Sequence, residues 1–416
     1  MNLKTNQQKR TYKVLIIIFA VIILVFCVLP VCNYFRGSTK DYGRFYQAGQ
    51  SMLSGGDIYI KGGETFQFLY PPTAAVLYAL MSIFGFLPMI ILFVMTNAAL
   101  WIVSIFLSVY LTTGKIMMQH PLLYLVPTAC CIPFVWDIFQ LGQPNLWLLA
   151  CMLGAFVCLQ LKKEWPAGVL IAFAASLKAF PILALVYLLY RQRWRASLST
   201  VVFLIFFLAV LPIPFRGVQR NFQDLKTWTN GMVLRYDTGS IAQRPGRGYG
   251  WKNQSLIAVA NRLLRPVDAF HSKSNPVYVN IANLEFKYLN IIIIATAMGL
   301  CLFYIGSMPR PAQRTLHTDS IEYAMLLILI LIFTPLSFTY FYVWLLYPLM
   351  VAVNTLLSLT YPSRAGNLAF IWFVVCLLLL SFMLPIPGFR WFAAIGSTLG
   401  ACVLLLGGLG WKLRHS

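Results

Sequence analysis

Charged residues are scarce in this 416-residue chain, and acidic residues are the scarcest. Only 10% of the residues are Asp, Glu, Lys or Arg, and Asp and Glu together number 11. An ordinary soluble domain has roughly 25% charged residues, so this composition excludes a soluble enzyme. The nine cysteines lie in or beside apolar runs without paired CxxC spacing, which excludes a zinc or disulfide framework.

Apolar residues, by contrast, make up 60% of the chain, and Lys and Arg number 32, giving a formal net charge of +21. So large an apolar excess does not fit inside a soluble core, because much of a folded protein's surface faces water. The basic residues lie between the apolar runs, where lipid headgroups and the cytoplasmic side of a membrane attract them. We therefore expect an integral membrane protein whose partner is the lipid bilayer and not a nucleic acid.

Apolar segments bounded by proline, glycine or charge predict the passes through the membrane. They indicate an all-α polytopic protein of about 12 transmembrane helices (roughly 10–13) in a single membrane domain, residues 1–416. Residues 167–190 form either a crossing or a re-entrant hairpin broken around Lys178 and Pro181, so the topology of residues 112–190 stays open. The expected crossings are residues 14–31, 73–85, 88–111, 121–139, 145–161, 167–190, 197–212, 289–307, 322–338, 341–357, 368–384 and 391–411.

Two polar segments are not expected to cross the membrane. Residues 33–72 follow the first helix, and residues 215–288 contain eleven Lys or Arg and four acids. An even number of crossings keeps both basic ends of the chain in the cytoplasm and places these two loops on the non-cytoplasmic face. The four acids of the long basic loop are expected to form ion pairs. We expect the chemistry on this outer face.

Asp41 directly precedes a short amphipathic helix that residues 42–53 predict in the first outer loop. Apolar residues recur there at helical spacing, and Gly55-Gly56 closes the helix. The helix is expected to lie flat in the membrane interface. Two roles for Asp41 remain open, since it is either the N-cap of this helix or a general base that takes a proton from a hydroxyl.

Five stretches of the sequence carry a resemblance to a known enzyme family. They are residues 41–59 with Phe68-Leu-Tyr-Pro-Pro72, Gln140-Leu-Gly-Gln-Pro-Asn145, Ala167-Gly168 through Ser176-Leu-Lys-Ala-Phe-Pro181 to the basic Arg191–Arg195, Asn253-Gln-Ser-Leu256 with Asn261-Arg-Leu263, and Pro335-Leu-Ser337 with Val343-Trp-Leu345. In this order they resemble the motifs of glycosyltransferase family 87, whose members are C-type glycosyltransferases that use polyprenyl-phosphate sugars. The resemblance covers Asp41 to roughly Pro348.

The resemblance implies a C-type glycosyltransferase fold with outer-face interfacial helices. It also implies transfer of a hexose, mannose first of all, from a polyprenyl-phosphate carrier to a hydroxyl of a glycan or glycolipid. The reaction would invert the anomeric carbon, with Asp41 as the general base. Family members often carry one or two histidines after Pro-x-Ser, whereas this chain has Phe338-Thr-Tyr-Phe-Tyr342. Either Tyr340 or Tyr342 replaces them, or the donor differs.

Groups that would bind the donor phosphate or sugar are numerous. Lys178 lies in an apolar helix, where a lysine is either functional or snorkels or pairs, for example with Asp137. Gln143 and Asn145 either bind sugar hydroxyls or satisfy a helix break at the intervening proline. The glycine-rich basic stretch 244–252 binds either a phosphate or lipid headgroups. The candidates are Arg44, Tyr70, Gln143, Asn145, Lys178, Arg247, Lys252, Asn253, Gln254, Tyr340 and Tyr342.

A transporter or flippase for an amphipathic anion, such as a lipid-linked sugar, is the alternative function. Transporters usually contain internal repeats, and the halves of this chain show no clear repeat. No carboxylate cluster or DxD-type pair indicates a metal site, so no metal or other cofactor is predicted. We expect the protein in a bacterial cytoplasmic (inner) membrane, with its active site on the outer face.

Overall fold

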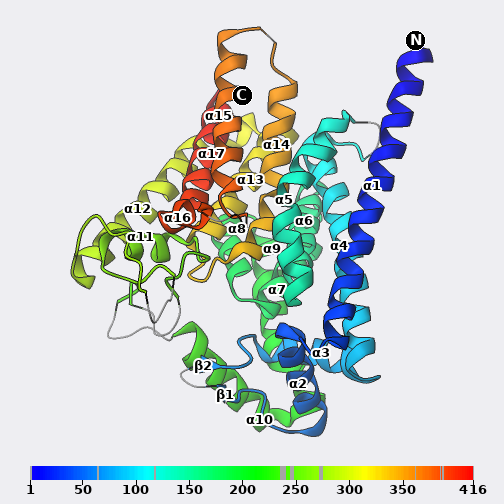
Figure 1. Ribbon diagram of the computed structural model, residues 1–416, viewed down its shortest axis with the longest axis vertical. Coiled ribbons are helices and arrows are strands. Elements are labelled where there is room, and N and C mark those ends of the chain that lie inside the picture. Colours follow the sequence, from blue (N-terminus) through cyan, green and yellow to red (C-terminus); the bar gives the residue numbers. More distant parts are fainter. Residues whose placement is uncertain are drawn as a thin grey trace. The chain divides into compact units, whose positions relative to one another are not determined.

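The computed structural model describes residues 2–62, 65–116, 119–234, 240–243, 248–270, 275–360, 362–384, 386 and 388–415. These residues are mainly helical (Figure 1), with one antiparallel ribbon of strands β1 (Lys61–Gly62) and β2 (Thr65–Phe66). The chain divides into two compact units. The first comprises Met1–Leu111, Lys115–Thr128 and Phe134–Leu234, and the second comprises Thr112–Gly114, Ala129–Pro133 and Arg235–Ser416.

The first unit contains the long N-terminal helix and most of the short apolar helices. Helix α7 packs against both α6 and α9. Gly168 permits the closest approach, because a Cβ there would lie 2.5 Å from the carbonyl oxygen of Ala196. The helices are α1 (Asn2–Phe35), α2 (Lys40–Ser54), α3 (Pro72–Ser82), α4 (Phe86–Thr113), α5 (Pro121–Leu141), α6 (Asn145–Gln160), α7 (Glu164–Leu177), η1 (Phe180–Leu183), α8 (Ala184–Tyr190), α9 (Trp194–Ile205), η2 (Phe206–Val210), α10 (Ile213–Trp228) and η3 (Thr229–Val233).

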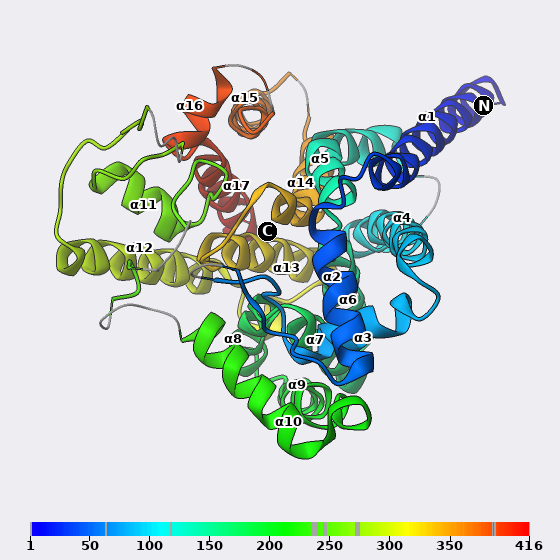
Figure 2. The same ribbon diagram turned by 60° about the horizontal axis from the view of Figure 1, so that its bottom comes forward.

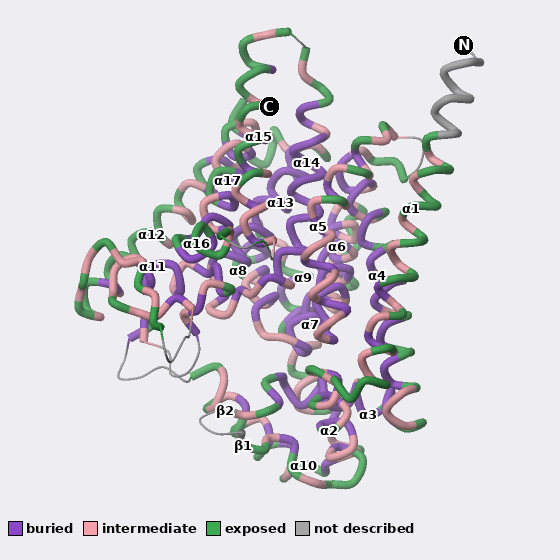
Figure 3. Tube along the Cα trace, in the orientation of Figure 1, coloured by how far each residue is buried: buried purple, intermediate pink, exposed green. Residues whose placement is uncertain are grey.

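The second unit is built around helices that are apolar on every side. Nearly all of α13 and α14 is buried (Figure 3), and α17 packs against α13 and α15. A helix without a polar face requires such surroundings. The helices are α11 (Leu256–Leu264), α12 (Phe286–Ser307), η4 (Pro311–Gln313), α13 (Leu316–Phe333), η5 (Thr339–Leu345), α14 (Leu346–Leu357), α15 (Arg364–Ser381), α16 (Phe389–Ala394) and α17 (Ser397–Arg414).

The structure confirms an all-helical polytopic membrane protein but shows fewer spans than the sequence predicts. Among the described residues, seven helices are long and apolar enough to cross a membrane, or eight if a pair bent by 96° at residues 211–212 is one span. The predicted count of 12 is not shown. Three expected crossings (73–85, 145–161 and 167–190) instead form four apolar helices of 10–17 residues, shorter than the roughly 20 residues that a helical crossing needs. They are Pro72–Ser82, Asn145–Gln160, Glu164–Leu177 and Phe180–Tyr190.

The predicted break around Lys178 and Pro181 is present. Helix α7 ends at Leu177, Lys178 has an extended backbone, and the chain continues in the 3-10 turn η1.

The long basic loop contains regular helices, since residues 215–288 include most of α10, all of η3 and α11, and the start of α12. Helix α10 itself is interrupted at Gly217, whose φ of 69° is readily accessible only to glycine.

Helix α2 forms where the amphipathic pattern predicts it, and Gly55 ends it in a left-handed conformation. Helix α2 packs against α3 (Figure 2), and the residues of its apolar face are mostly buried. The rings of Phe45 and Tyr78 stack 4.5 Å apart, and a Cβ on Gly49 would lie 2.8 Å from the backbone of Tyr78. That α2 lies in the membrane interface stays a prediction.

Candidate active site

The Asp41 carboxylate lies at the start of α2 and is held by two side chains. The helix begins at Lys40 with Thr39 as its N-cap, so Asp41 belongs to the first turn and is not the cap itself. Its Oδ2 accepts a hydrogen bond of 2.7 Å from Nε2 of Gln143. Its Oδ1 accepts one of 3.1 Å from Arg44, which lies one turn further along the helix. A negative charge in the first turn is also stabilised by the helix dipole.

Gln143 connects this carboxylate to a lysine. Its Oε1 accepts hydrogen bonds from the Tyr70 hydroxyl at 2.8 Å and from Lys178 Nζ at 3.3 Å. Lys178 also donates to Asn145 Oδ1 at 3.0 Å, and its ammonium lies 5.2 Å from the centre of the Tyr70 ring. We call Asp41, Tyr70, Gln143, Asn145 and Lys178 the Asp41 cluster. The structure thus brings together residues that the sequence proposed separately.

The side chains around Asp41 differ in solvent exposure. Gln143, Asn145 and Tyr70 are 3%, 0% and 7% exposed, whereas the Asp41 side chain is 27% exposed and that of Arg44 56%. A carboxylate that is partly exposed above buried polar partners is accessible to a substrate and still fixed in orientation. The exposed pair of Asp41 and Arg44 contributes little to stability by itself.

The turn between α5 and α6 presents Gln143 and Asn145. Gly142 ends α5 with a φ of 82°, and its N–H caps the carbonyl of Ile138. A Cβ at this position would lie 2.9 Å from the Tyr42 ring, so glycine allows α2 to approach. The Tyr42 hydroxyl in turn donates to the Phe139 carbonyl at 2.7 Å. The turn Gly142-Gln-Pro-Asn145 therefore lets α2 pack against it and places the Gln143 side chain beside Asp41.

Tyr70 and Lys178 come from the ends of two other helices. Tyr70 precedes Pro71 and Pro72, which begin α3, and its carbonyl accepts a hydrogen bond of 2.9 Å from Tyr59. Burial raises the pKa of Tyr59 well above its usual value, so this phenol stays a donor. Lys178 leaves the helical path at the end of α7, which directs its side chain toward Gln143.

The candidates in the second unit hold the chain's own backbone. The Asn253 side chain donates to the carbonyl of Pro335 at 2.9 Å, and its Oδ1 accepts from the Ser337 N–H at 3.0 Å. Gln254 donates to the carbonyls of Trp251 and Ala393, both at 2.6 Å. These contacts join the Asn-Gln-Ser and Pro-Leu-Ser motifs, and a ligand-binding role for either amide stays a prediction.

The remaining candidates of this unit differ in exposure. Lys252 is exposed, with its ammonium 5.6 Å from the Trp251 ring. Tyr342 is buried at 1% exposure, while Tyr340 is partly buried and tilted over Phe341. Arg247 lies outside the described residues. The structure groups Arg44, Tyr70, Gln143, Asn145 and Lys178 around Asp41, and it places these others in the second unit.

The sequence analysis assigned no role to Arg262, a fully buried cation on α11. Its guanidinium donates to the carbonyls of Ala394, Tyr249, Gly250 and Asn253 at 2.7–2.9 Å. Burial lowers the pKa of Arg262 to about 9. The available signal was an arginine beside the Asn-Gln-Ser motif in a helix with one apolar face. In the part of the chain that the structure describes, no three His, Cys, Asp or Glu side chains group closely enough to hold a metal ion.

These features define a polytopic membrane protein with a carboxylate, two amides, a phenol and a lysine in one partly exposed cluster, beside Arg44. Residues 68–335, more than half of the chain, match the model of glycosyltransferase family 87, and the chain belongs to that family. Asp41 precedes the matched range, whereas Tyr70, Gln143, Asn145 and Lys178 lie within it. The resemblance identified from the sequence is thereby confirmed.

One curated relative has a known activity. The chain is 26% identical over 171 residues to the polyprenol-phosphate-mannose-dependent alpha-(1-2)-phosphatidylinositol mannoside mannosyltransferase of Mycolicibacterium smegmatis. The match covers 38% of this chain and 38% of the relative, so it spans well under half of the relative's length. No solved structure matches the chain.

Proposed function

We propose that this protein transfers a hexose, mannose being the first candidate, from a polyprenyl-phosphate carrier to an acceptor hydroxyl on the non-cytoplasmic face of a bacterial inner membrane. Membership of glycosyltransferase family 87 supports the reaction class. The name of the mycobacterial relative supports a polyprenol-phosphate-mannose donor and a glycolipid acceptor. The observation that carries the proposal is the partly exposed Asp41 carboxylate, fixed by Gln143 and linked through it to Lys178.

The chemistry is a single displacement. The acceptor oxygen forms a bond to the anomeric carbon while the bond from that carbon to the phosphate oxygen breaks, so the configuration inverts. Asp41 takes the proton of the attacking hydroxyl as general base. The leaving polyprenyl phosphate gains negative charge, which Lys178 and Arg44 stabilise from either side of the carboxylate. No step requires a co-reactant beyond donor and acceptor.

Replacement of Asp41 by asparagine tests this function. Asp41→Asn keeps the size of the side chain and an oxygen that accepts from Gln143, but it removes the base. Reconstituted protein supplied with polyprenyl-phosphate mannose and membrane glycolipids should then transfer about 10²–10⁴ times more slowly. Asp57→Asn is the matched control, because Asp57 lies in the same loop with an 80% exposed side chain, and it should transfer at the wild-type rate.

Two results would overturn the proposal. Undiminished transfer by Asp41→Asn would remove Asp41 as the base. Vectorial uptake of the lipid-linked sugar without any transfer would favour the transporter or flippase. A parallel assay with polyprenyl-phosphate glucose decides the donor, since the missing histidines after Pro335-Leu-Ser337 leave the sugar open.

A further inference from the structure

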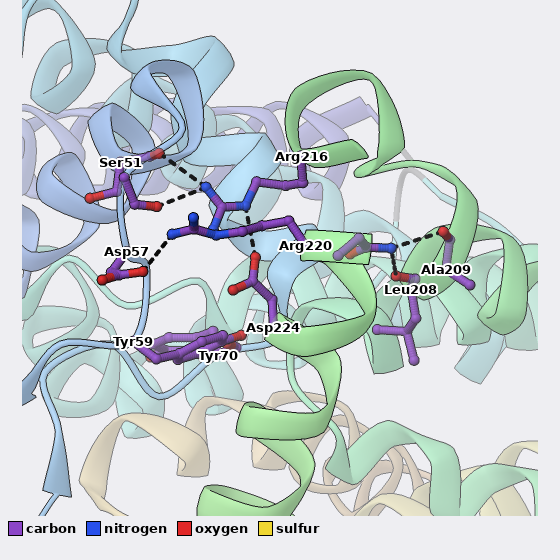
Figure 4. A network of polar contacts seen from close by, with 11 residues as sticks. Ser51, Asp57, Tyr59, Tyr70, Leu208, Ala209, Arg216, Arg220 and Asp224 are labelled. Carbon is purple, nitrogen blue, oxygen red and sulfur yellow. Dashed lines mark hydrogen bonds and ion pairs between the residues drawn. The ribbon is translucent and has the colours of Figure 1, made fainter. Parts of the chain in front are cut away.

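Helix α10 turns a charged face toward the first outer loop (Figure 4). Arg216 Nε donates to Asp224 Oδ2 at 2.7 Å, and Nη1 donates to the carbonyls of Gly56 at 2.8 Å and Ser51 at 3.4 Å. The two ionic side chains are 0% and 11% exposed. Four residues further along the chain, Arg220 pairs with Asp57, but this pair is open to solvent at 40% and 80% exposure.

Arg216 occupies the carboxyl end of α2. Ser51 belongs to the last turn of that helix, and Gly56 follows its Gly55 terminus. The last carbonyls of a helix lack intrahelical partners and carry partial negative charge. A guanidinium binds them well, because several donors project from one rigid plane. Asp224 neutralises Arg216, so the contact buries no net charge.

Helix α10 is itself anchored independently of α2. Asn221 donates to the carbonyls of Leu208 and Ala209 at 3.3 and 2.9 Å, which ties α10 to η2. Trp228 donates to the carbonyl of Leu69 at 3.2 Å, immediately before Tyr70. The break at Gly217 separates Arg216 from the regular part of the helix, so Arg216 reaches Asp224 eight residues later. The Arg216–Asp224 pair is therefore a fixed support and not a surface contact.

We propose that Arg216 is a positioning residue for the transfer reaction, which holds the carboxyl end of α2 so that Asp41 at its amino end stays against Gln143. This inference rests on the proposed role of Asp41. A straight helix transmits the restraint over the ten residues from Asp41 to Ser51, about 15 Å at 1.5 Å per residue. Misplacement of a reacting group by about 1 Å slows a reaction by about 10²-fold, so a modest shift of α2 is sufficient.

The test removes the buried pair as a unit. Arg216→Met with Asp224→Leu leaves no lone buried charge, which favours folding. For transfer from polyprenyl-phosphate mannose we expect kcat to fall by about 10- to 100-fold, with the donor KM within about threefold of wild type because Arg216 does not touch substrate. The matched control is Arg220→Gln, which removes an exposed arginine of the same helix and should keep both constants.

Two further variants keep the proposal falsifiable. Arg216→Lys retains the charge but lacks the planar fork, so we expect a folded protein with an intermediate kcat even if the double variant does not fold. When Arg216→Met and Asp224→Leu are combined with Gln143→Leu, kcat should be no lower than in Gln143→Leu alone. The reason is that the Arg216–Asp224 pair and Gln143 both act through the orientation of Asp41. Additive losses would overturn the proposal, as would a kcat unchanged in Arg216→Lys and in the folded double variant.

Asp41→Asn separates this inference from the proposed function. If Asp41→Asn transfers at the wild-type rate, Asp41 is not the base, and this part of the proposed function fails whatever the Arg216 variants show. If Asp41→Asn is inactive and the Arg216 variants keep the wild-type kcat, the positioning role alone fails.

Discussion

Substitution of Gln143 by leucine is the sharpest perturbation that the Asp41 cluster offers. Gln143 is 3% exposed and has a leucine-like volume, so Gln143→Leu changes polarity more than packing. It removes the donor to Asp41 Oδ2 at 2.7 Å and the acceptor used by Tyr70 at 2.8 Å and Lys178 at 3.3 Å. The carboxylate loses its orienting contact and keeps only Arg44 of its two partners described above.

The magnitudes follow from these three contacts. A hydrogen bond to a charged group contributes about 1.5–3 kcal/mol, which corresponds to about 10- to 150-fold in rate if the bond is needed for transfer. The hydrogen bonds from Tyr70 and from Lys178 are lost as well, at about 0.5–1.5 and about 1.5–3 kcal/mol, and Lys178 keeps its contact with Asn145. We therefore expect transfer to fall about 10- to 150-fold, with a loss of stability of about 2–5 kcal/mol.

The assay must separate these two effects. Tyr347→Phe is the control, since Tyr347 is fully buried in the second unit and donates to the carbonyl of Ser320 at 2.8 Å. Melting temperatures should fall in both variants, whereas kcat per folded molecule should fall only in Gln143→Leu. The reasoning is refuted if Gln143→Leu transfers within about threefold of wild type, or if Tyr347→Phe loses an equal share of activity.

Three further predictions concern backbone and packing. Gly142→Ala should lower both melting temperature and transfer rate, because its φ of 82° and the Tyr42 ring at 2.9 Å leave no room for a Cβ. Gly49→Leu should shift α2 away from Tyr78 and reduce activity, measurable as increased proteolysis of the 33–72 loop. Arg262→Met should destabilise the protein by about 2–4 kcal/mol through its lost carbonyl contacts, and Arg262→Lys should recover part of the melting temperature.

Local structure was largely predictable from the sequence, because local signals determine it. The apolar spacing and Gly55-Gly56 gave α2 within two residues, and the break around Lys178 and Pro181 is where α7 ends. The span count was not predictable in the same way. An apolar run such as residues 145–161 has the same composition whether it faces lipid or is a short helix covered by protein, and Asn145–Gln160 is largely covered.

The site was predictable as a set of residue types but not as a geometry. Asp41 and Gln143 are 102 residues apart, and no spacing rule links an acid in one loop to an amide after a distant helix. Ion pairing of Asp224 was expected from its basic surroundings, and Arg216 confirms it. The hydrogen bond from Arg216 to the end of α2 depends on the break at Gly217 and on tertiary packing, which sequence alone does not specify.

The single amide between Asp41 and Lys178 has a chemical consequence. Gln143 satisfies each ion with the opposite end of one primary amide, its NH₂ toward Asp41 and its oxygen toward Lys178. In the reaction that we propose, the carboxylate takes the acceptor proton and Lys178 stabilises the departing phosphate, so one amide orients both groups for their separate tasks.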